Sequence, residues 1–302
     1  MISMNERQLG LLQMISAMIM MGTVGYFVLE SGQRPYEIVF YRCLFGTVLL
    51  FFYCSLTGML KNTGLNYKNL IFLILSGVFL IVNWIALFAS FDLASIAVST
   101  TIYHFQPFIF LIIWALVSKE SISKDKYFWM ILAFLGVIFV SDLNFSNLEL
   151  TSSYLNGLLL AILAAFFWAI SAVLVKKITG IKPHLVVLIQ MIVGGLILFP
   201  FMEMSSISSV NEKQWLYLFI LGLVHTCLTY ILMYSSYQKL NATSIAILTF
   251  IYPVIAIIVD YIFYGNILNI IQIIGVFLIL ISSLASSQNF NPFKIKTPVN
   301  IK

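Results

Sequence analysis

Few side chains in this sequence could do chemistry, because charged and titratable residues are rare inside its long apolar segments. Arg42, His104 and His225 fall well within such segments. An arginine there is a fixed positive charge that can hold a carboxylate. A histidine titrates near neutral pH and can carry a proton. Ionisable groups inside an apolar span are costly, so each of the three is a candidate functional residue.

Each candidate also has a plainer interpretation. Arg42 lies six residues into its segment, about 9 Å from the end at 1.5 Å per residue. Its guanidinium could therefore reach the lipid headgroups or pair with Glu30 or Glu37 instead of facing a cavity. A buried histidine is often a neutral imidazole that hydrogen-bonds between helices. Two distant histidines without cysteine or carboxylate partners do not predict a metal site.

The composition indicates that these residues sit in a membrane. The 302 residues are 61% hydrophobic and 9% charged, whereas a soluble domain is about 25% charged. The chain divides into ten apolar segments, most of which approach the ~20 residues that a membrane-spanning helix needs. Strands of a membrane barrel would be shorter and would alternate in polarity, so the sequence predicts an all-α integral membrane protein. The segments are 9–29, 36–56, 70–91, 96–117, 127–140, 155–175, 185–202, 215–237, 245–264 and 270–284.

The basic residues divide unequally between alternate loops. If the N-terminus is cytoplasmic, thirteen of the 16 lysines and arginines are on the inside and two, Arg34 and Lys213, are outside, with Arg42 in a span. This bias follows the positive-inside rule. It predicts a multi-pass protein of a cell membrane, such as a bacterial inner membrane, with both termini cytoplasmic and the loop 141–153 outside. It also explains the net charge of +5 without a nucleic-acid partner.

Residues 9–141 and 155–287 carry matching features at matching places. Pro107 lies near the middle of the fourth span of the first half, and Pro253 lies near the middle of the corresponding span of the second half. The last span of each half is unusually short. Because each half has an odd number of spans, two similar halves must insert with opposite orientation. The sequence therefore predicts two inverted five-helix repeats, followed by a short basic tail, 288–302.

Short motifs in both halves resemble the drug/metabolite transporter superfamily, specifically its EamA-type members. The first half contains Ala94-Ser-Ile-Ala-Val98, Gln106-Pro107, Lys119-Glu120 and Gly136-Val137. The second half contains Asn241-Ala-Thr-Ser-Ile-Ala246, Tyr252-Pro253 and Gly275-Val276. The chain departs from the family pattern at Met21-Gly22, where members often have Trp-Gly, while the second half keeps Trp168-Ala169. The resemblance implies a transporter fold whose members handle amino acids, other metabolites or drugs.

The two prolines indicate where a transport pathway would lie. Proline frees a backbone carbonyl and bends a helix, and a membrane tolerates this only where protein or a watery cavity satisfies the backbone. We therefore expect polar and aromatic side chains near them to bind substrate, with ordinary packing as the alternative for each. The candidates are Arg42, Asn83, Trp84, His104, Gln106, Pro107, Trp168, Gln190, His225, Tyr230, Tyr252 and Pro253.

These observations favour a secondary transporter that moves a small metabolite or drug by alternating access. Its expected partners are the substrate, the lipid bilayer and, if either buried histidine titrates, a coupling proton. We expect no cofactor, and the sequence has no G-x-x-x-x-G-K-[ST] motif for ATP. An integral membrane enzyme or flippase acting on lipid-linked substrates is the alternative, although it would require clustered acidic or histidine residues. The sequence leaves the oligomeric state open.

Overall fold

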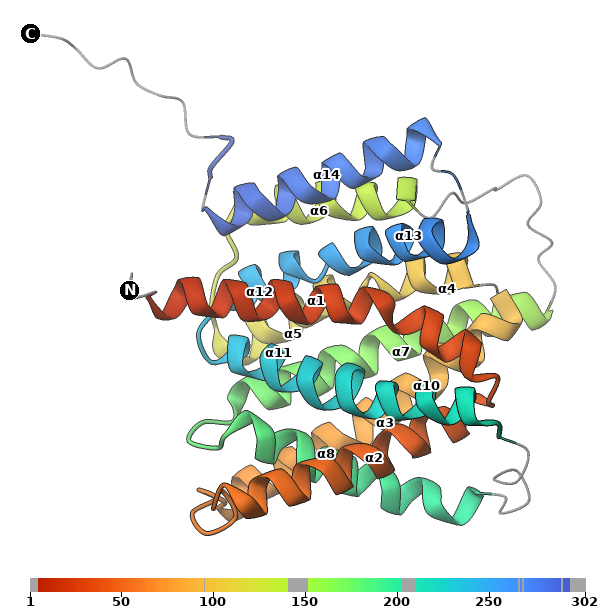
Figure 1. Ribbon diagram of the computed structural model, residues 1–302. Coiled ribbons are helices and arrows are strands. Elements are labelled where there is room, and N and C mark those ends of the chain that lie inside the picture. Colours follow the sequence, from red (N-terminus) through yellow and green to blue (C-terminus); the bar gives the residue numbers. More distant parts are fainter. Residues whose placement is uncertain are drawn as a thin grey trace, which may run out of the picture.

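The chain forms a bundle of helices in a computed structural model, which describes residues 5–94, 96–140, 152–202, 210–265, 267, 269–288 and 290–293 (Figure 1). None of these residues is in a strand, so the all-α prediction is confirmed. The predicted outer loop 141–153 and the predicted tail lie largely outside the described residues.

The helices follow the predicted segments closely. The first half contains α1 (Glu6–Ser31), α2 (Pro35–Leu56), α3 (Tyr67–Ala94), α4 (Ile96–Tyr103), α5 (Gln106–Ser118) and α6 (Lys124–Val140). The second half contains α7 (Ser152–Lys177), α8 (Pro183–Leu198), the short 3₁₀-helix η2 (Phe199–Phe201), α10 (Glu212–Gly222), the π-helix η3 (Leu223–Leu228), α11 (Thr229–Tyr237), α12 (Ala242–Leu248), α13 (Ile251–Tyr264) and α14 (Ile270–Ser287).

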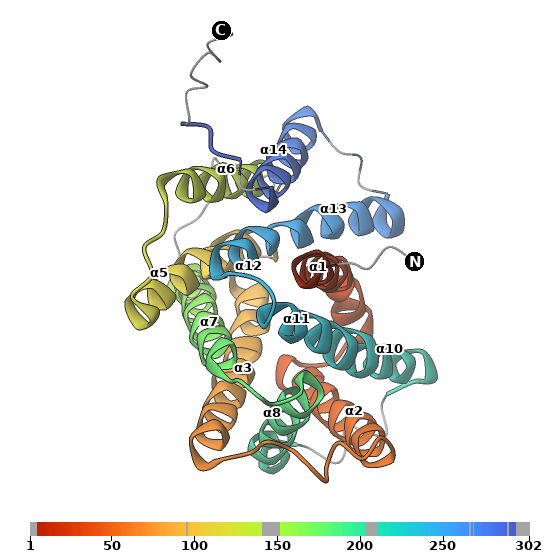
Figure 2. The same cartoon turned by 90° about the vertical axis from the view of Figure 1, so that its left-hand side faces the viewer.

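Eight helical segments within the described residues are long and apolar enough to cross a membrane. The fifth and tenth predicted spans correspond to shorter helices. α6 has 17 residues and begins with Lys-Asp-Lys, and the apolar part of α14 runs over Ile270–Ser286. Figures 1 and 2 show these two helices side by side at one edge of the bundle. Length and composition therefore support at least eight of the ten predicted spans.

Proline breaks two of the long segments at corresponding places. α4 ends at Tyr103 and α5 begins with Gln106 and Pro107, while α12 ends at Leu248 and α13 carries Pro253 in its first turn. Proline lacks the backbone N–H that a helix needs, and its ring clashes with the carbonyl four residues earlier. The breaks therefore fall just before each proline, as the sequence predicts, and they leave polar backbone groups in the middle of the bundle.

The bundle is assembled by pairs of helices that are distant in sequence. α3 packs along α7, α2 along α8, and α1 against both α11 and α13, as the end-on view in Figure 2 shows. Small residues permit the closest approaches, as is usual between membrane helices. A Cβ atom added to Gly136 of α6 would lie 2.7 Å from the carbonyl oxygen of Gly275 in α14, and one added to Gly275 would lie 2.6 Å from that of Gly136.

We predict that Gly136→Ala destabilises the protein by about 1–3 kcal/mol, the usual cost of overpacking a close contact. The added methyl group would meet backbone of α14, which cannot move aside as a flexible side chain can. Gly195→Ala is the matched control, because a Cβ atom there meets nothing within 4 Å. Thermal unfolding in detergent should show a lower midpoint for Gly136→Ala alone. Equal midpoints for the two variants would contradict the tight α6–α14 contact.

Candidate functional site: a central cavity with a buried arginine

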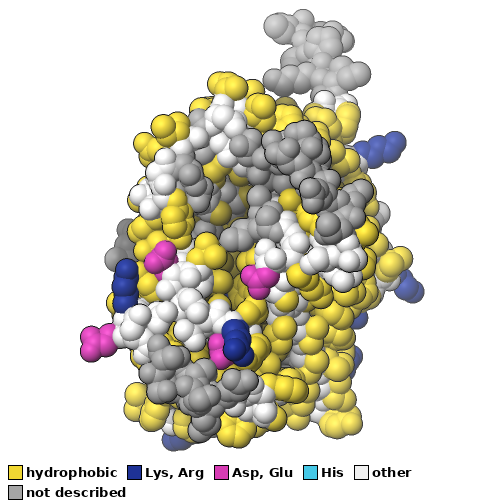
Figure 3. All heavy atoms as spheres, turned by 90° about the vertical axis from the view of Figure 1, so that its right-hand side faces the viewer, with side chains coloured by type: hydrophobic (Ala, Val, Ile, Leu, Met, Phe, Trp, Pro, Cys, Tyr) yellow, Lys and Arg dark blue, Asp and Glu magenta, His cyan; other side chains and the backbone are white. Residues whose placement is uncertain are grey.

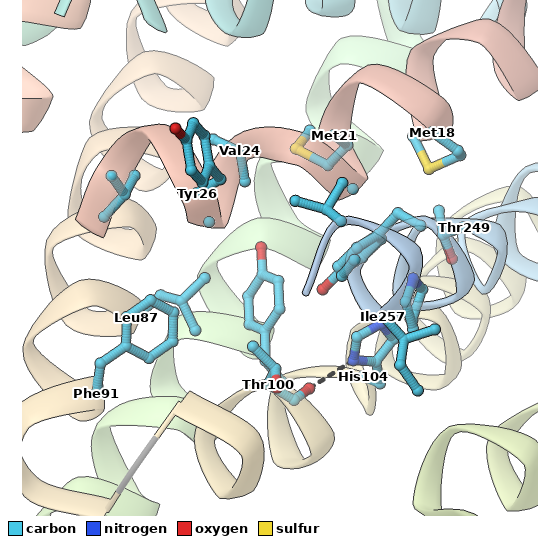
Figure 4. A pocket seen from close by; sticks show the side chains of 18 of the residues that line it. Met18, Met21, Val24, Tyr26, Leu87, Phe91, Thr100, His104, Thr249 and Ile257 are labelled. Atoms are coloured by element: carbon cyan, nitrogen blue, oxygen red, sulfur yellow. Dashed lines mark hydrogen bonds between the residues drawn. The ribbon is translucent and has the colours of Figure 1, made fainter. Parts of the chain in front are cut away.

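A cavity of about 420 Å³ lies in the middle of the bundle. Both halves of the chain supply its walls. Figure 4 shows α1 side chains (Met18, Met21, Val24 and Tyr26) across the cavity from those of α3 (Leu87 and Phe91), of α4 and the turn after it (Thr100 and His104), and of the second proline-broken segment (Thr249 and Ile257). The volume is within the range of ~300–1,000 Å³ typical of small-molecule sites.

The cavity opens toward one end of the bundle. Its lining includes residues where α1, α3, α6 and α13 end and where α14 begins, namely Leu29, Phe91, Val140, Tyr264 and Gln272. Figure 3 shows this end of the molecule, with a hollow among hydrophobic side chains. A solute would therefore meet an apolar entrance before it reached the polar groups deeper inside.

The opposite end of the bundle is closed by aromatic packing and by one lysine. The Phe110 ring lies 6.2 Å from that of Trp168 and 6.5 Å from that of Tyr237, measured between centroids. Lys176 Nζ donates to the carbonyl oxygens of Tyr237 at 3.0 Å and Leu240 at 2.8 Å. These contacts tie α7 to the end of α11, where the helix dipole favours a cation. The cavity thus has one open and one closed end.

Arg42 of α2 is buried at the cavity wall, with 2% of its surface exposed. Its Nε donates to Thr226 Oγ1 at 3.0 Å, and its Nη2 donates to the carbonyl oxygen of His225 at 3.1 Å. The guanidinium carbon lies 3.9 Å from the centre of the Trp84 ring. No carboxylate of the described residues lies within ion-pair distance, and Nη1 has no partner among them. The positive charge is held by neutral groups only.

The partners of Arg42 are available because the backbone of η3 is not α-helical. In an α-helix the N–H of Thr229 would bond to the carbonyl of His225, four residues earlier. Here that N–H points to the carbonyls of Val224 and Thr226 instead, so the carbonyl of His225 is available to Arg42. Such π-helical turns often occur at functional sites. Neither the composition nor the periodicity of this segment predicts the π-helix.

Aromatic groups of α3 and α11 surround the guanidinium. Trp84 Nε1 donates to the hydroxyl of Tyr230 at 3.0 Å, and the two rings meet edge to face with centroids 5.5 Å apart. Both side chains line the cavity, and both are almost completely buried. Trp84 therefore presents one face to Arg42 while its N–H fixes the position of Tyr230. The positive charge and its aromatic support move as one unit.

The break between α4 and α5 places two polar side chains at the cavity. His104 Nδ1 hydrogen-bonds to the carbonyl oxygen of Thr100, the dashed line in Figure 4. The imidazole lies 4.5 Å from the Tyr252 ring, measured between centroids. The buried atoms His104 Nε2 and Gln106 Oε1 have no hydrogen-bond partner among the described residues. Both side chains have 2% of their surface exposed and line the cavity.

The structure brings eight of the twelve sequence-predicted candidates to the cavity. They are Arg42, Trp84, His104, Gln106, Trp168, Tyr230, Tyr252 and Pro253. The proposed pairing of Arg42 with acidic residues does not occur, since Glu37 Oε2 accepts the backbone N–H of Arg34 and Glu30 Oε1 accepts from the Tyr264 hydroxyl. Arg42 also does not reach the headgroup region, because its side chain points into the protein.

The other four candidates lie outside the cavity lining. Asn83 donates to the Tyr103 hydroxyl and to the carbonyl of Ala164, so it joins α3 to α7. The side chain of Gln190 similarly joins α8 to α3 and α11. His225 packs with its ring 5.0 Å from that of Phe27, and Pro107 is buried beside the lining residue Gln106. Packing, one of the two interpretations given to each, describes these positions.

Sequence reasoning missed the contribution of α1. Met18, Met21 and Tyr26 line the cavity, yet this helix contains no ionisable residue between Arg7 and Glu30 other than Tyr26. One signal was present: Met21-Gly22 occupies the place that corresponds to Trp168-Ala169, and both Met21 and Trp168 are at the cavity. Tyr103 and Thr249 were also missed, and they too lie beside the two proline breaks.

Comparison with known proteins identifies the family. The sequence model of the EamA-like transporter family matches residues 8–142 and again 155–288. An uncharacterised transporter of Bacillus subtilis, YxxF, is 28% identical over 92% of this chain and 89% of its own length. The pseudopaline exporter CntI of Pseudomonas aeruginosa is 23% identical over 83% of this chain and 86% of its own length.

A more distant relative and a solved structure extend the comparison. The riboflavin transporter ImpX of Fusobacterium nucleatum is 23% identical over 64% of this chain and 67% of its own length. One crystal structure superposes with a TM-score of 0.78 at 14% identity, over 93% of this chain and 96% of the other, and so shares the fold. The relatives are named as transporters, which favours transport over the membrane-enzyme alternative. With its apolar helices and two family matches, this chain is a multi-pass membrane protein and belongs to the EamA-like transporter family.

Proposed function

We propose that this protein is a secondary transporter that moves a small carboxylate-bearing metabolite across the cytoplasmic membrane by alternating access. The observation that carries the proposal is Arg42, a buried cation at the cavity wall without a carboxylate partner among the described residues. A charge in a desolvated site costs several kcal/mol unless it is paired. Neutral acceptors and the face of Trp84 offset part of that cost. An anionic ligand would supply the rest.

The remaining lining of the cavity fits an amphipathic solute. Trp84, Trp168, Tyr230 and Tyr252 offer aromatic surface, and the mouth is apolar. No acidic side chain is among the described lining residues. A carboxylate bound to Nη1 of Arg42 would form a charge-assisted hydrogen bond, while its apolar body would contact the aromatic walls.

Corresponding contacts in the two halves support an inverted repeat of two five-helix units, 9–141 and 155–287. A Cβ atom on Gly10 would meet Leu240, and one on Gly157 would meet Ala94, so α1 and α7 begin with equivalent contacts. The residues Gly136 and Gly275 contact each other reciprocally. Trp84 and Tyr230, which are bonded to each other, are separated by the same 146 residues as Pro107 and Pro253. These pairs would be related by a twofold axis in the membrane plane.

The open and closed ends of the cavity support alternating access. With the N-terminus in the cytoplasm, the open end faces outward and the Lys176 contacts close the inner side. Rocking of the two halves would break those contacts and open the other end. Because the sequence contains no nucleotide-binding motif, an ion gradient or exchange would drive transport. Coupling of a proton through His104 or His225 is one form of this.

We predict that Arg42→Gln lowers transport of carboxylate substrates by about 10- to 100-fold, the range expected for a hydrogen bond to a charged group. Folding should be nearly unchanged, since the corresponding residue of the second half is already Gln190. Arg42→Lys should restore transport only in part, because an ammonium lacks the planar two-pronged geometry. Uptake into proteoliposomes, with substrates chosen by comparing metabolite pools of deletion and overexpressing cells, measures this.

Lys213→Gln is the matched control for that experiment. It removes one positive charge at the exposed end of α10 and should leave transport at the level of the unmodified protein. Unaltered kinetics in a well-folded Arg42→Gln protein would show that Arg42 is structural, and the anionic-substrate proposal would then be abandoned.

We further predict that a cysteine at Ala256 is labelled by a membrane-impermeant thiol reagent added from outside, in a protein whose three native cysteines are replaced. Ala256 lines the cavity, whereas Ile258 of the same helix does not and is the control. A cysteine at Lys213 should also react from outside, and one at Lys68 should not. Labelling of Lys68 but not of Lys213 would reverse the proposed topology.

A further inference from the structure

Two unused hydrogen-bond acceptors at the α4–α5 break bear on which carboxylates the cavity would take. Fixed by its tautomer, His104 has only one way to present its second nitrogen. The carbonyl oxygen of Thr100 can only accept, so His104 Nδ1 must carry the proton of that hydrogen bond. In the neutral imidazole the other nitrogen, Nε2, is then an acceptor with a free lone pair.

That nitrogen is buried and is not used by the protein. His104 is 98% buried, and Nε2 has no partner among the described residues. The imidazole is held by its bond to Thr100 and by the rings of Tyr252 and Phe250, with centroids at 4.5 and 6.2 Å. A buried acceptor without a partner costs about 1–3 kcal/mol, so such groups call for an explanation. Here the cavity provides one.

Gln106, two residues further on, adds a second polar group without a protein partner. Its side chain has 2% of its surface exposed and lines the same cavity, and its Oε1 is unpartnered. The amide could be turned over, which would present its NH₂ group instead. In either orientation, His104 Nε2 remains the fixed acceptor. The α4–α5 break thus forms an acceptor site in the cavity that also holds Arg42.

The charge of the cavity limits which donor would occupy this site. Arg42 contributes a full positive charge, and the described lining residues include no carboxylate. A substrate ammonium would therefore find a like charge and only neutral acceptors. An uncharged donor such as a hydroxyl would satisfy His104 Nε2 without that repulsion.

We propose that His104 selects carboxylates that also bear an uncharged hydrogen-bond donor, with hydroxy acids as the simplest class. This inference rests on the proposed function, since it assumes that Arg42 holds the carboxylate. Arg42 would then provide the affinity common to all carboxylates, and His104 would discriminate among them. His104 is in this sense a specificity residue that touches the substrate.

Binding of matched carboxylates to the purified protein tests the proposal. One series is phenylpropanoate, phenyllactate and phenylalanine, which differ only in carrying no donor, a hydroxyl or an ammonium beside the carboxylate. A second series with a branched aliphatic body is isocaproate, hydroxyisocaproate and leucine. Tryptophan fluorescence reports binding, because Trp84 and Trp168 line the cavity. The hydroxy acid should bind about threefold to tenfold more tightly than both other members, the range of one neutral hydrogen bond.

His104→Phe should abolish the preference for the hydroxy acid and leave the affinity for the donor-free acid nearly unchanged. Phenylalanine keeps the ring between Tyr252 and Phe250 but has no acceptor. His184→Phe is the matched control, since His184 stacks on Tyr53 outside the cavity lining and should keep the preference. Gln106→Met provides a second test if His104→Phe unfolds, and it should weaken the preference without affecting the donor-free acid.

The outcomes separate this inference from the proposed function. Equal binding of all members, tighter binding of the amino acids, binding of none of the hydroxy acids, or a preference that survives in well-folded His104→Phe would each overturn the role of His104. Equal binding by Arg42→Gln and the unmodified protein would instead overturn the role of Arg42. A loss of affinity for all members in Arg42→Gln, with the hydroxy acid preference absent from the unmodified protein, would leave the proposed function standing and remove only the inference.

Discussion

The site depends on one physical constraint, which is that the positive charge of Arg42 must be kept inside an apolar bundle. Removing a guanidinium from water is expensive, and the described residues near it offer no carboxylate. The protein instead supplies a hydroxyl, a backbone carbonyl released by the π-helix η3, and the face of Trp84. These groups come from α3 and the α10–α11 segment, so the charge also determines how those helices meet at the cavity.

Features common to both halves build the frame, and differences between them create the chemistry. The proline breaks and the close glycine contacts occur in both halves. At corresponding positions, by contrast, Arg42 stands against Gln190 and His104 against Phe250. The π-helix also has no counterpart in the regular helix α3. A symmetric frame suits two similar end states, whereas an asymmetric lining lets one face of a solute be distinguished from the other.

The closed end of the cavity is held by contacts of modest strength. Lys176 bonds two carbonyls at the end of α11, and its Nζ also lies 5.1 Å from the centre of the Trp114 ring. Hydrogen bonds of this kind each contribute only a few kcal/mol, and aromatic packing such as that of Phe110 can be re-formed elsewhere. A closure of this strength is stable enough to separate two compartments and weak enough to be opened by substrate binding energy.

The sequence by itself determined the class of the protein and the position of nearly every helix. Hydropathy is a local property, so apolar segments, proline breaks and the family motifs are readable along the chain. It also pointed to Arg42, because a charge in an apolar segment is conspicuous. Tertiary structure alone decided what that charge contacts. The partners of Arg42 lie more than 180 residues away, and the π-helix that releases one of them depends on packing. For the same reason, the place of His104 at the cavity and of His225 outside it could not be distinguished from the sequence.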